Sequence, residues 1–326
     1  MLTLRPTDDY PHPVGIESNF NESMYFQFHD PELDVGGFLR LANRPNEGLG
    51  ERTVCLYLPD GSVAFSFARP QVVLNDSFAA AGLTVDVNQP FESLSVAFDG
   101  ELNVMVNPEA LADPKRAFST SPVVLCRVRL DFRAAAPPYA ETFDGDGGSF
   151  APNHYEQLMR VSGSVLVGKN SLRVEGHGLR DHSWGPRSWQ APWFYRWVHG
   201  SSDGFGFMGA YFGAPDGTAR SGGFVWDGTD LHPCHTVELA TERDPKHLPR
   251  TVHLQLVADE RRWEFRGRAG ALVPLRHRKC DADGQWSVTR IAEAATVWTG
   301  EDGTTLNGMA EYLDQVRDGL PVGLGV

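Results

Sequence analysis

Apolar and polar residues alternate in short runs along the whole chain. Residues 123–132 give the clearest example, because Cys126, Val128, Leu130 and Phe132 alternate with charged residues. A period of two is typical of a β-strand with one buried face and one wet face. Similar runs occupy residues 23–29, 37–42, 52–58, 62–68, 83–87, 94–98, 157–167, 171–179, 193–199, 204–212, 251–257, 262–268, 286–299 and 304–313. The pattern predicts an antiparallel all-β protein.

A region of small and turn-forming residues divides these runs into two similar blocks. Ala, Pro, Gly and Asp dominate residues 134–149, and the only helix-like stretch lies around residues 108–116. Each block has enough strands for a barrel or a sandwich of its own. We therefore expect two domains, each a barrel or a sandwich, over residues 1–150 and 151–326.

Composition narrows the class of protein. The 34 glycines and 22 prolines are spread among the runs, as turns between short strands require. Lys and Arg total 29 against 42 Asp and Glu, a net charge of −13, which argues against nucleic acid or an anionic membrane as partner. No stretch approaches the ~20 apolar residues of a membrane span, and the start lacks an apolar signal core. The four cysteines lie far apart without Cys-x-x-Cys spacing. A cytoplasmic protein is expected.

One motif is misleading. Gly204, Gly206 and Gly209 spell the G-x-G-x-x-G dinucleotide fingerprint, which needs a strand before it and a helix after it. Aromatic residues fill the gaps here, and the next feature is the turn Pro215-Asp-Gly. This pattern is typical of a strand with small residues on one face. No nucleotide or other cofactor is therefore expected.

The densest group of chemically active side chains lies between residues 176 and 190. Asp181 can supply a carboxylate to His182 if a turn brings the two together, which favours a protonated imidazole. A protonated histidine in an aromatic-walled pocket is a plausible general acid. Trp184 can stabilise a developing cation, and Arg187 can hold a carboxylate or carbonyl of a ligand. Further along, Trp193, Tyr195 and Trp197 occupy alternate positions and should share one face of a strand.

A purely structural interpretation competes with this one. The imidazole of His182 could be a satisfied core group, and Arg180 and Arg187 could be ion-pair partners of Asp181 or Glu156. Metal binding has less support. His177 and His182 lack a third ligand placed by spacing, and the group His232, Cys234 and His235 surrounds a proline. No metal is therefore predicted.

The stretch Gly178-Leu-Arg-Asp-His-Ser-Trp-Gly-Pro-Arg187, preceded by His154-Tyr-Glu-Gln157, resembles the carotenoid 1,2-hydratase-like and AttH-like superfamily. That superfamily includes bacterial carotenoid hydratases and fungal Diels–Alderase-type cyclases. The resemblance extends to Asn307-Gly-Met-Ala-Glu-Tyr312 and implies two tandem lipocalin-like antiparallel β-barrels packed side by side. It also implies catalytic roles for His182 and Trp184. The hydratases use a tyrosine and an aspartate further along the chain. Tyr211 lies in that region, but Phe212-Gly213 supply no acid, which is a departure from carotenoid hydration.

These observations together predict a cofactor-independent enzyme that acts on a hydrophobic, isoprenoid- or polyketide-like small molecule. Hydration, isomerisation or cyclisation of an alkene by acid catalysis in an aromatic pocket would all fit. The predicted catalytic residues are His182, Trp184 and Asp181. The predicted substrate-binding residues are Arg187, Trp193, Trp197, Tyr155 and Tyr211. The alternative is a carrier that binds a hydrophobic ligand without changing it, and the sequence leaves the oligomeric state open.

Overall fold

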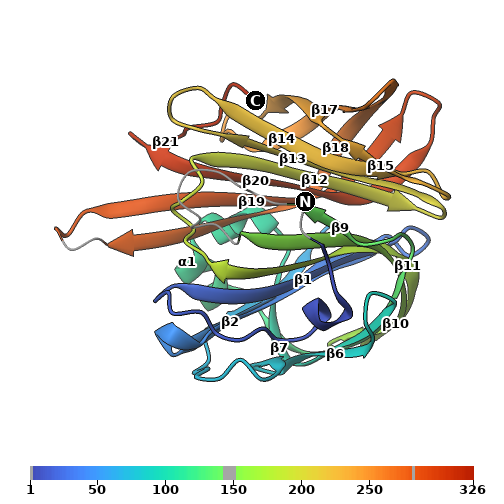
Figure 1. The fold of residues 1–326 in the computed structure, drawn as a ribbon. Coiled ribbons are helices and arrows are strands. Elements are labelled where there is room, and N and C mark those ends of the chain that lie inside the picture. The colour runs from blue at the N-terminus through green and yellow to red at the C-terminus, as the bar shows by residue number, and fades with distance from the viewer. Residues whose placement is uncertain (1–2, 142–151, 281–282) are drawn as a thin grey trace. The chain divides into compact units, whose positions relative to one another are not determined.

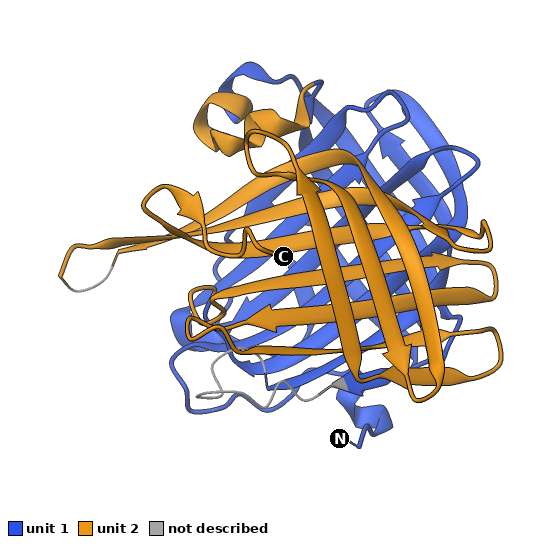
Figure 2. Ribbon diagram, turned by 90° about the horizontal axis from the view of Figure 1, so that it is seen from above, with its two compact units in different colours: residues 1–106, 118–188 blue, residues 107–117, 189–326 orange. Residues whose placement is uncertain are grey.

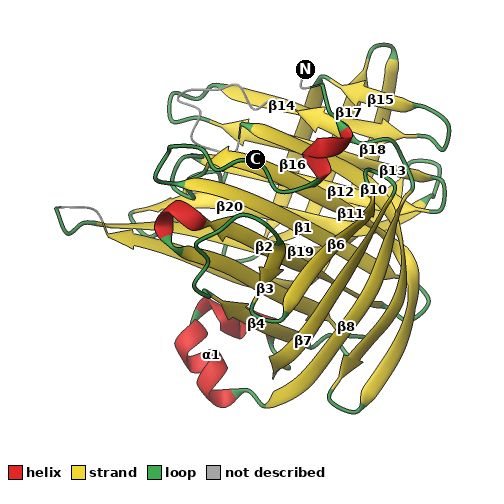
Figure 3. Ribbon diagram, turned by 60° about the horizontal axis from the view of Figure 1, so that its bottom comes forward, coloured by secondary structure: helices red, strands yellow, loops and turns green. Residues whose placement is uncertain are grey.

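The computed structural model describes residues 3–141, 152–280 and 283–326, and strands dominate them (Figure 3). Strand β8 (Val123–Ala134) shows why alternating apolar and polar residues predict a strand with one buried face. Its residues Cys126, Val128, Leu130 and Phe132 are buried, while the residues between them are exposed. Two large antiparallel sheets account for the structure, which confirms the predicted all-β class with two tandem lipocalin-like halves.

The chain divides into two compact units (Figure 2). Unit 1 comprises residues 1–106 and 118–188, and unit 2 comprises residues 107–117 and 189–326. This division differs from the boundary expected at residue 150. The reason is hydrogen bonding, because strands β10 (Asn153–Val167) and β11 (Asn170–Pro186) pair with β8 and with β1 (Phe20–Asp30). Both strands after residue 150 are therefore part of the first sheet.

Unit 1 closes into a ring of strands. Its remaining strands are β2 (Val35–Arg44), β3 (Leu49–Tyr57), β4 (Val63–Ala68), β5 (Phe78–Ala80), β6 (Leu83–Gln89), β7 (Ser93–Met105) and β9 (Tyr139–Glu141). The hydrogen-bonded order is β4-β3-β2-β1-β11-β10-β8-β7, and β4 pairs with β7 to complete the circle. Strands β6 and β5 continue the sheet from the first half of β7.

Unit 2 repeats this order with different strands (Figure 1). They are β12 (Phe194–Ser202), β13 (Phe205–Gly213), β14 (Ala219–Trp226), β15 (Leu231–Cys234), β16 (Thr236–Arg243), β17 (Pro249–Ala258), β18 (Arg261–Cys280), β19 (Trp286–Gly300), β20 (Thr305–Arg317) and β21 (Leu320–Pro321). Their order is β15-β14-β13-β12-β20-β19-β18-β17-β16. Strand for strand this matches β4-β3-β2-β1-β11-β10-β8-β7-β6, so the two units share one topology.

The helices are short. η1 (Pro6–Asp9) precedes β1, and η2 (Pro45–Glu47) joins β2 to β3. η3 (Pro108–Ala112) and α1 (Pro114–Thr120) occupy the stretch expected to be helical. η3 belongs to unit 2, where Glu109 forms ion pairs with Lys246 and Arg250. Among the described residues, no helix has both the length and the apolar character needed to cross a membrane.

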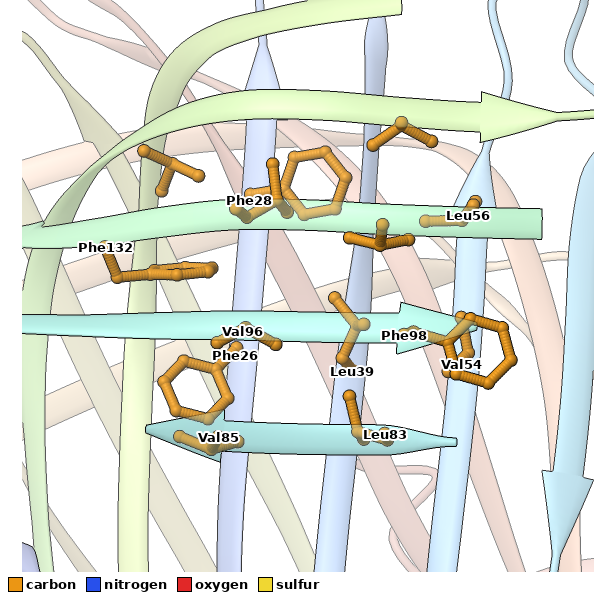
Figure 4. Close-up of a cluster of buried hydrophobic side chains, with 14 of the residues drawn as sticks. Phe26, Phe28, Leu39, Val54, Leu56, Leu83, Val85, Val96, Phe98 and Phe132 are labelled. Atoms are coloured by element: carbon orange, nitrogen blue, oxygen red, sulfur yellow. The ribbon is translucent and has the colours of Figure 1, made fainter. Parts of the chain in front are cut away.

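The inside of the unit 1 ring is filled by apolar side chains (Figure 4). Phe26, Phe28, Phe98 and Phe132 are almost completely buried there. Side chains of successive residues on a strand point to opposite faces. We call the face that carries Met24 and the phenylalanines the core face of the unit 1 sheet, and the other the outer face. Unit 2 has a separate apolar cluster of its own.

Candidate functional site

The motif Asp181-His-Ser-Trp184 distributes its side chains over both faces of β11. His182 lies opposite Met24 of β1, a core residue, so His182 and Trp184 are on the core face. Asp181 lies opposite Tyr25 of β1 and is on the outer face. The extended strand therefore separates Asp181 from His182, which the sequence analysis proposed to act together.

On the core face His182 is fully buried, and both of its ring nitrogens have partners. Nε2 lies 2.9 Å from Oε1 of Glu22, and Nδ1 lies 3.1 Å from the Tyr155 hydroxyl oxygen. The tyrosine donates its hydroxyl proton to Oδ1 of Asp9 at 2.6 Å. The carboxylate bonded to His182 is thus that of Glu22.

The network continues into a buried ion pair. Arg180 donates to both carboxylate oxygens of Asp9, and it also donates to Oε1 of Gln157 at 2.7 and 3.0 Å. The backbone N–H of Phe91 donates to Asp9 as well. The partner of Arg180 is therefore Asp9, from the segment that precedes β1. We call Asp9, Glu22, Tyr155, Arg180 and His182 the core-side network.

Burial and charge set the protonation of this network. Burial raises the pKa of Tyr155 well above its ordinary value, so the phenol keeps its proton. Burial also favours the neutral form of Asp9, but the Arg180 guanidinium outweighs it, and the pKa of Asp9 is lowered. For Glu22, hydrogen bonds from His12 and His182 overcome burial and lower the pKa to about 2. Two buried carboxylates are thus ionised and held by fixed donors.

Trp184 lies beside this network. Its ring stacks on the His12 ring with centroids 3.8 Å apart and an interplanar angle of 10°. The ring of His182 is 5.3 Å from Trp184, and that of Tyr155 is 6.3 Å from it. The predicted residues His182, Trp184 and Tyr155 are therefore brought together, inside the ring of unit 1.

The outer face carries a second titratable cluster, formed by His154, Glu156 and Asp181. His154 and Glu156 are two residues apart on β10 and share a face, and Glu156 lies opposite Asp181 on β11. Nε2 of His154 contacts Oδ2 of Asp181 in a short hydrogen bond and lies 3.5 Å from Oε1 of Glu156. The side chains of His154 and Asp181 retain 10% and 16% exposure. We call these three residues the Asp181 cluster.

The charge of His154 controls the acid beside it. Burial raises the pKa of Asp181, but the charge and hydrogen bond of His154, together with the charge of Arg187, outweigh burial and lower the pKa. The carboxylate is therefore ionised and orients the ring of His154, as the acid of a His–Asp pair does. On the same face, Nη1 of Arg187 donates to Oγ of Ser183 at 3.2 Å.

Aromatic rings extend this face away from the Asp181 cluster. Tyr25 of β1 is the cross-strand neighbour of Asp181. Its ring stacks on Phe38 of β2 at 5.5 Å, and Phe38 contacts Tyr57 of β3 at 6.4 Å. Unit 1 thus places an acid–base pair at one end of an aromatic row on the outer face of its sheet.

The other predicted binding residues belong to unit 2. Trp197 lies on β12 with its ring 4.9 Å from His199, and Tyr211 stacks on Phe194 at 6.2 Å. Trp193 directly precedes the first residue of β12. The Arg317 guanidinium lies 5.6 Å from the centre of the Trp193 ring. These residues have contacts of their own within unit 2 and take no part in the core-side network.

The metal-binding alternatives weighed from spacing are not assembled. His177 and His182 have opposite parity on β11, so their side chains leave opposite faces of the strand. His232 contacts Asp227 at 2.7 Å, whereas His235 contacts Oγ1 of Thr236 at 3.0 Å. Each of these histidines has a different environment.

Several residues of these clusters were missed from the sequence. Asp9, His12 and Glu22 stand in or near a segment without periodicity, and nothing in their spacing places them beside His182. His154 and Glu156 did carry a signal, because a histidine and a glutamate two apart on a strand share a face. That signal requires the register of β10 against β11 before it identifies Asp181 as their neighbour.

A cavity of about 610 Å³ lies in unit 2, over β16, β17, β18 and β19. Glu238, Glu264, Glu301 and Arg266 are among its lining residues. Pockets for hydrophobic ligands are lined mainly by apolar side chains with few polar groups. The lining of this cavity is mixed, because Leu239, Leu254 and Phe265 also contribute to it.

Comparison with known proteins gives matches by structure and by family. No curated protein sequence matches the chain. A solved structure of a candidate AttH protein from Nitrosomonas europaea has 14% identity and a TM-score of 0.51, covering 90% of this chain and 92% of its own. CghA, also solved with Sch210972, has 10% identity and a TM-score of 0.56, covering 97% of this chain and 96% of its own. Kievitone hydratase from Nectria haematococca has 8% identity and a TM-score of 0.56, covering 97% and 93%.

At these identities the structural matches establish the fold. The family is established separately, because one family model matches residues 5–316, which is nearly the entire chain. The protein therefore belongs to the family described as domain of unknown function DUF7064.

Proposed function

We propose that this protein is an enzyme that transfers protons to and from a hydrophobic small molecule, with His154 and Asp181 as its catalytic pair. The observation that carries the proposal is the Asp181 cluster at the end of the row Tyr25, Phe38 and Tyr57. An imidazole held by a carboxylate is a common general acid and base. Aromatic rings beside it would stabilise positive charge as an alkene is protonated, and Tyr25, Phe38 and Tyr57 are themselves buried.

This assignment moves the proton donor away from His182. Both ring nitrogens of His182 are engaged inside the ring of unit 1, by Glu22 and Tyr155, and its side chain has no exposed surface. A general acid must come within hydrogen-bond reach of its substrate. The side chain of His154 retains 10% exposure, whereas that of His182 has none.

The fold relatives support the class of reaction. One of them is a hydratase by name, and another has been solved with the small molecule Sch210972. Addition of water to an alkene or enone needs a proton donor and a base that activates water. In this proposal His154 gives the proton and the carboxylate of Glu156, 3.5 Å from its ring, acts as the base toward a water molecule. Isomerisation of the double bond would use the same pair without water addition.

The packing of unit 1 weighs against a carrier role of the lipocalin kind. Such carriers hold their ligand inside the barrel. Here Phe26, Phe28, Phe98 and Phe132 occupy that interior. A carrier would therefore have to bind its ligand on the outer face, where a buried carboxylate beside an imidazole serves no purpose in holding an apolar molecule.

The test is incubation of the protein with a panel of isoprenoid and polyketide alkenes and enones in heavy water, followed by mass spectrometry. We expect a product with added heavy water, or with deuterium alone for an isomerase. His154→Gln and Asp181→Asn should lower turnover about 100-fold or more, with binding retained. Glu175→Gln is the matched control, because Glu175 is an exposed carboxylate on the same strand. Binding without conversion by the wild-type protein would favour the carrier, and unchanged turnover in His154→Gln would refute the assigned pair.

A further inference from the structure

Three metal-ligating side chains from separate parts of unit 1 meet at one point in the core-side network. His12 comes from the segment before β1, Glu22 from β1 and His182 from β11. Nδ1 of His12 lies 2.7 Å from Oε1 of Glu22, and Nε2 of His182 lies 2.9 Å from the same oxygen. One carboxylate oxygen therefore stands between two imidazole nitrogens.

The spacing of these atoms is close to that of neighbouring ligands on a metal ion. First-row divalent ions bind nitrogen and oxygen at roughly 2.0–2.2 Å. Two ligands at the tetrahedral angle that zinc prefers are then about 3.4 Å apart, so the separations of 2.7 and 2.9 Å need to grow by about 0.5–0.7 Å. Two histidines and one carboxylate on one side of the metal ion are the ligand set of many such sites, in which water fills the remaining coordination positions.

The surroundings hold two of the three ligands, Glu22 and His182, by their other polar atoms. Oε2 of Glu22 accepts hydrogen bonds from the backbone N–H of His12 at 2.8 Å and from the side-chain amide of Asn75. Nδ1 of His182 meets the Tyr155 hydroxyl, which is bonded in turn to Asp9. Outer partners of this kind fix ring orientation and ligand basicity in metal sites.

The charges around the Glu22 carboxylate are compatible with a bound cation. Arg180 is already paired with Asp9, and among the described residues the Glu22 carboxylate contacts His12, His182 and Asn75. Glu22 and His182 have no exposed surface, while His12 keeps 15% of its side-chain surface. An ion could therefore enter along the His12 side.

We propose that His12, Glu22 and His182 form a binding site for one first-row divalent transition-metal ion, such as zinc. Such an ion fastens the segment before β1 to the ring of unit 1. The site is separate from the Asp181 cluster, and the proposal does not depend on the proposed function.

The test uses the full chain after treatment with a chelator, titrated with Co²⁺ and then with competing Zn²⁺. We expect uptake of one ion per chain, a visible Co²⁺ spectrum from nitrogen and oxygen ligands, and a higher melting temperature with Zn²⁺. His12→Ala should weaken binding at least 100-fold and abolish the shift in melting temperature. His12 lies outside the strands, so this variant is expected to fold. His253→Ala is the matched control, because His253 is an exposed histidine of unit 2.

X-ray absorption of the zinc-loaded wild-type protein gives a readout that needs no variant. Two imidazoles and a carboxylate in the first shell are expected. No uptake of either ion would overturn the proposal and leave the three side chains as a hydrogen-bonded group. Uptake that His12→Ala leaves unchanged, or a first shell without imidazole, would place any bound ion elsewhere and also overturn it.

Discussion

Replacing Asp9 with asparagine tests how much the buried ion pair holds unit 1 together. Asp9 has no exposed surface and accepts hydrogen bonds from Arg180, Tyr155 and the backbone of Phe91. Asparagine keeps the size but loses the charge, which leaves Arg180 buried without its counter-ion. Breaking such a pair costs about 3–5 kcal/mol. For a unit of this size the cost corresponds to a fall in melting temperature of roughly 6–20 °C.

The assay is urea unfolding of Asp9→Asn beside Asp76→Asn, an exposed carboxylate in a loop of the same unit. The pH dependence gives a second check. Burial favours the neutral acid, but Arg180 outweighs it and lowers the pKa of Asp9 in the folded protein. The pair therefore stabilises the wild-type protein above the ordinary pKa of about 4. That stability is lost as the pH falls through the lowered pKa, so wild type and variant should converge in acid. Equal unfolding midpoints for the two variants at pH 7 would refute the reasoning.

Three further outcomes are expected. Gly178→Ala should lower the melting temperature strongly, because its Cβ would lie 1.9 Å from a backbone carbonyl oxygen of β1; Gly204→Ala, where the new Cβ meets only open space but φ is positive, should cost less and serves as the comparison in the same thermal scan. Asp314→Asn should destabilise unit 2 by about 3 kcal/mol in urea, since it leaves Arg196 buried without its ion-pair partner; a change below 1 kcal/mol would contradict this. A thiol reagent at pH 8 should label Cys280 rapidly and the other cysteines only in denaturant, because those three are buried; fast labelling of more than one thiol per native chain would argue against the described packing.

The sequence predicted the class of fold because alternation is a local property. In β8 the buried residues are the ones that the period of two selects. The G-x-G-x-x-G pattern was likewise interpreted from neighbouring residues as part of a strand, and its aromatic spacers do lie in strand β13. Strand pairing is not local, so the boundary between the units could not be read from the loop near residue 150. It follows from hydrogen bonds that join β11 to β1 across about 150 residues of chain.

The candidate site was likewise predicted from the sequence only in part. The sequence identified the stretch around Asp181 and His182 as chemically active, and the alternation of β11 accounts for how its side chains separate onto two faces. It could not supply the partners. Glu22 lies 160 residues from His182, and His154 lies 27 residues from Asp181. Both contacts depend on the register between strands, which is set by the packing of the whole sheet.

What the sequence by itself determined is therefore the set of strands and the region of chemistry, since both are written in the order of neighbouring residues. The tertiary structure alone decided which acid each histidine meets. His182 is enclosed with Glu22 and Tyr155, whereas His154 reaches Asp181 on the outer face. The physical reason is the closed ring of unit 1. Closing the sheet gives each strand one face toward a packed interior, and that assigns adjacent residues of one motif to different surroundings.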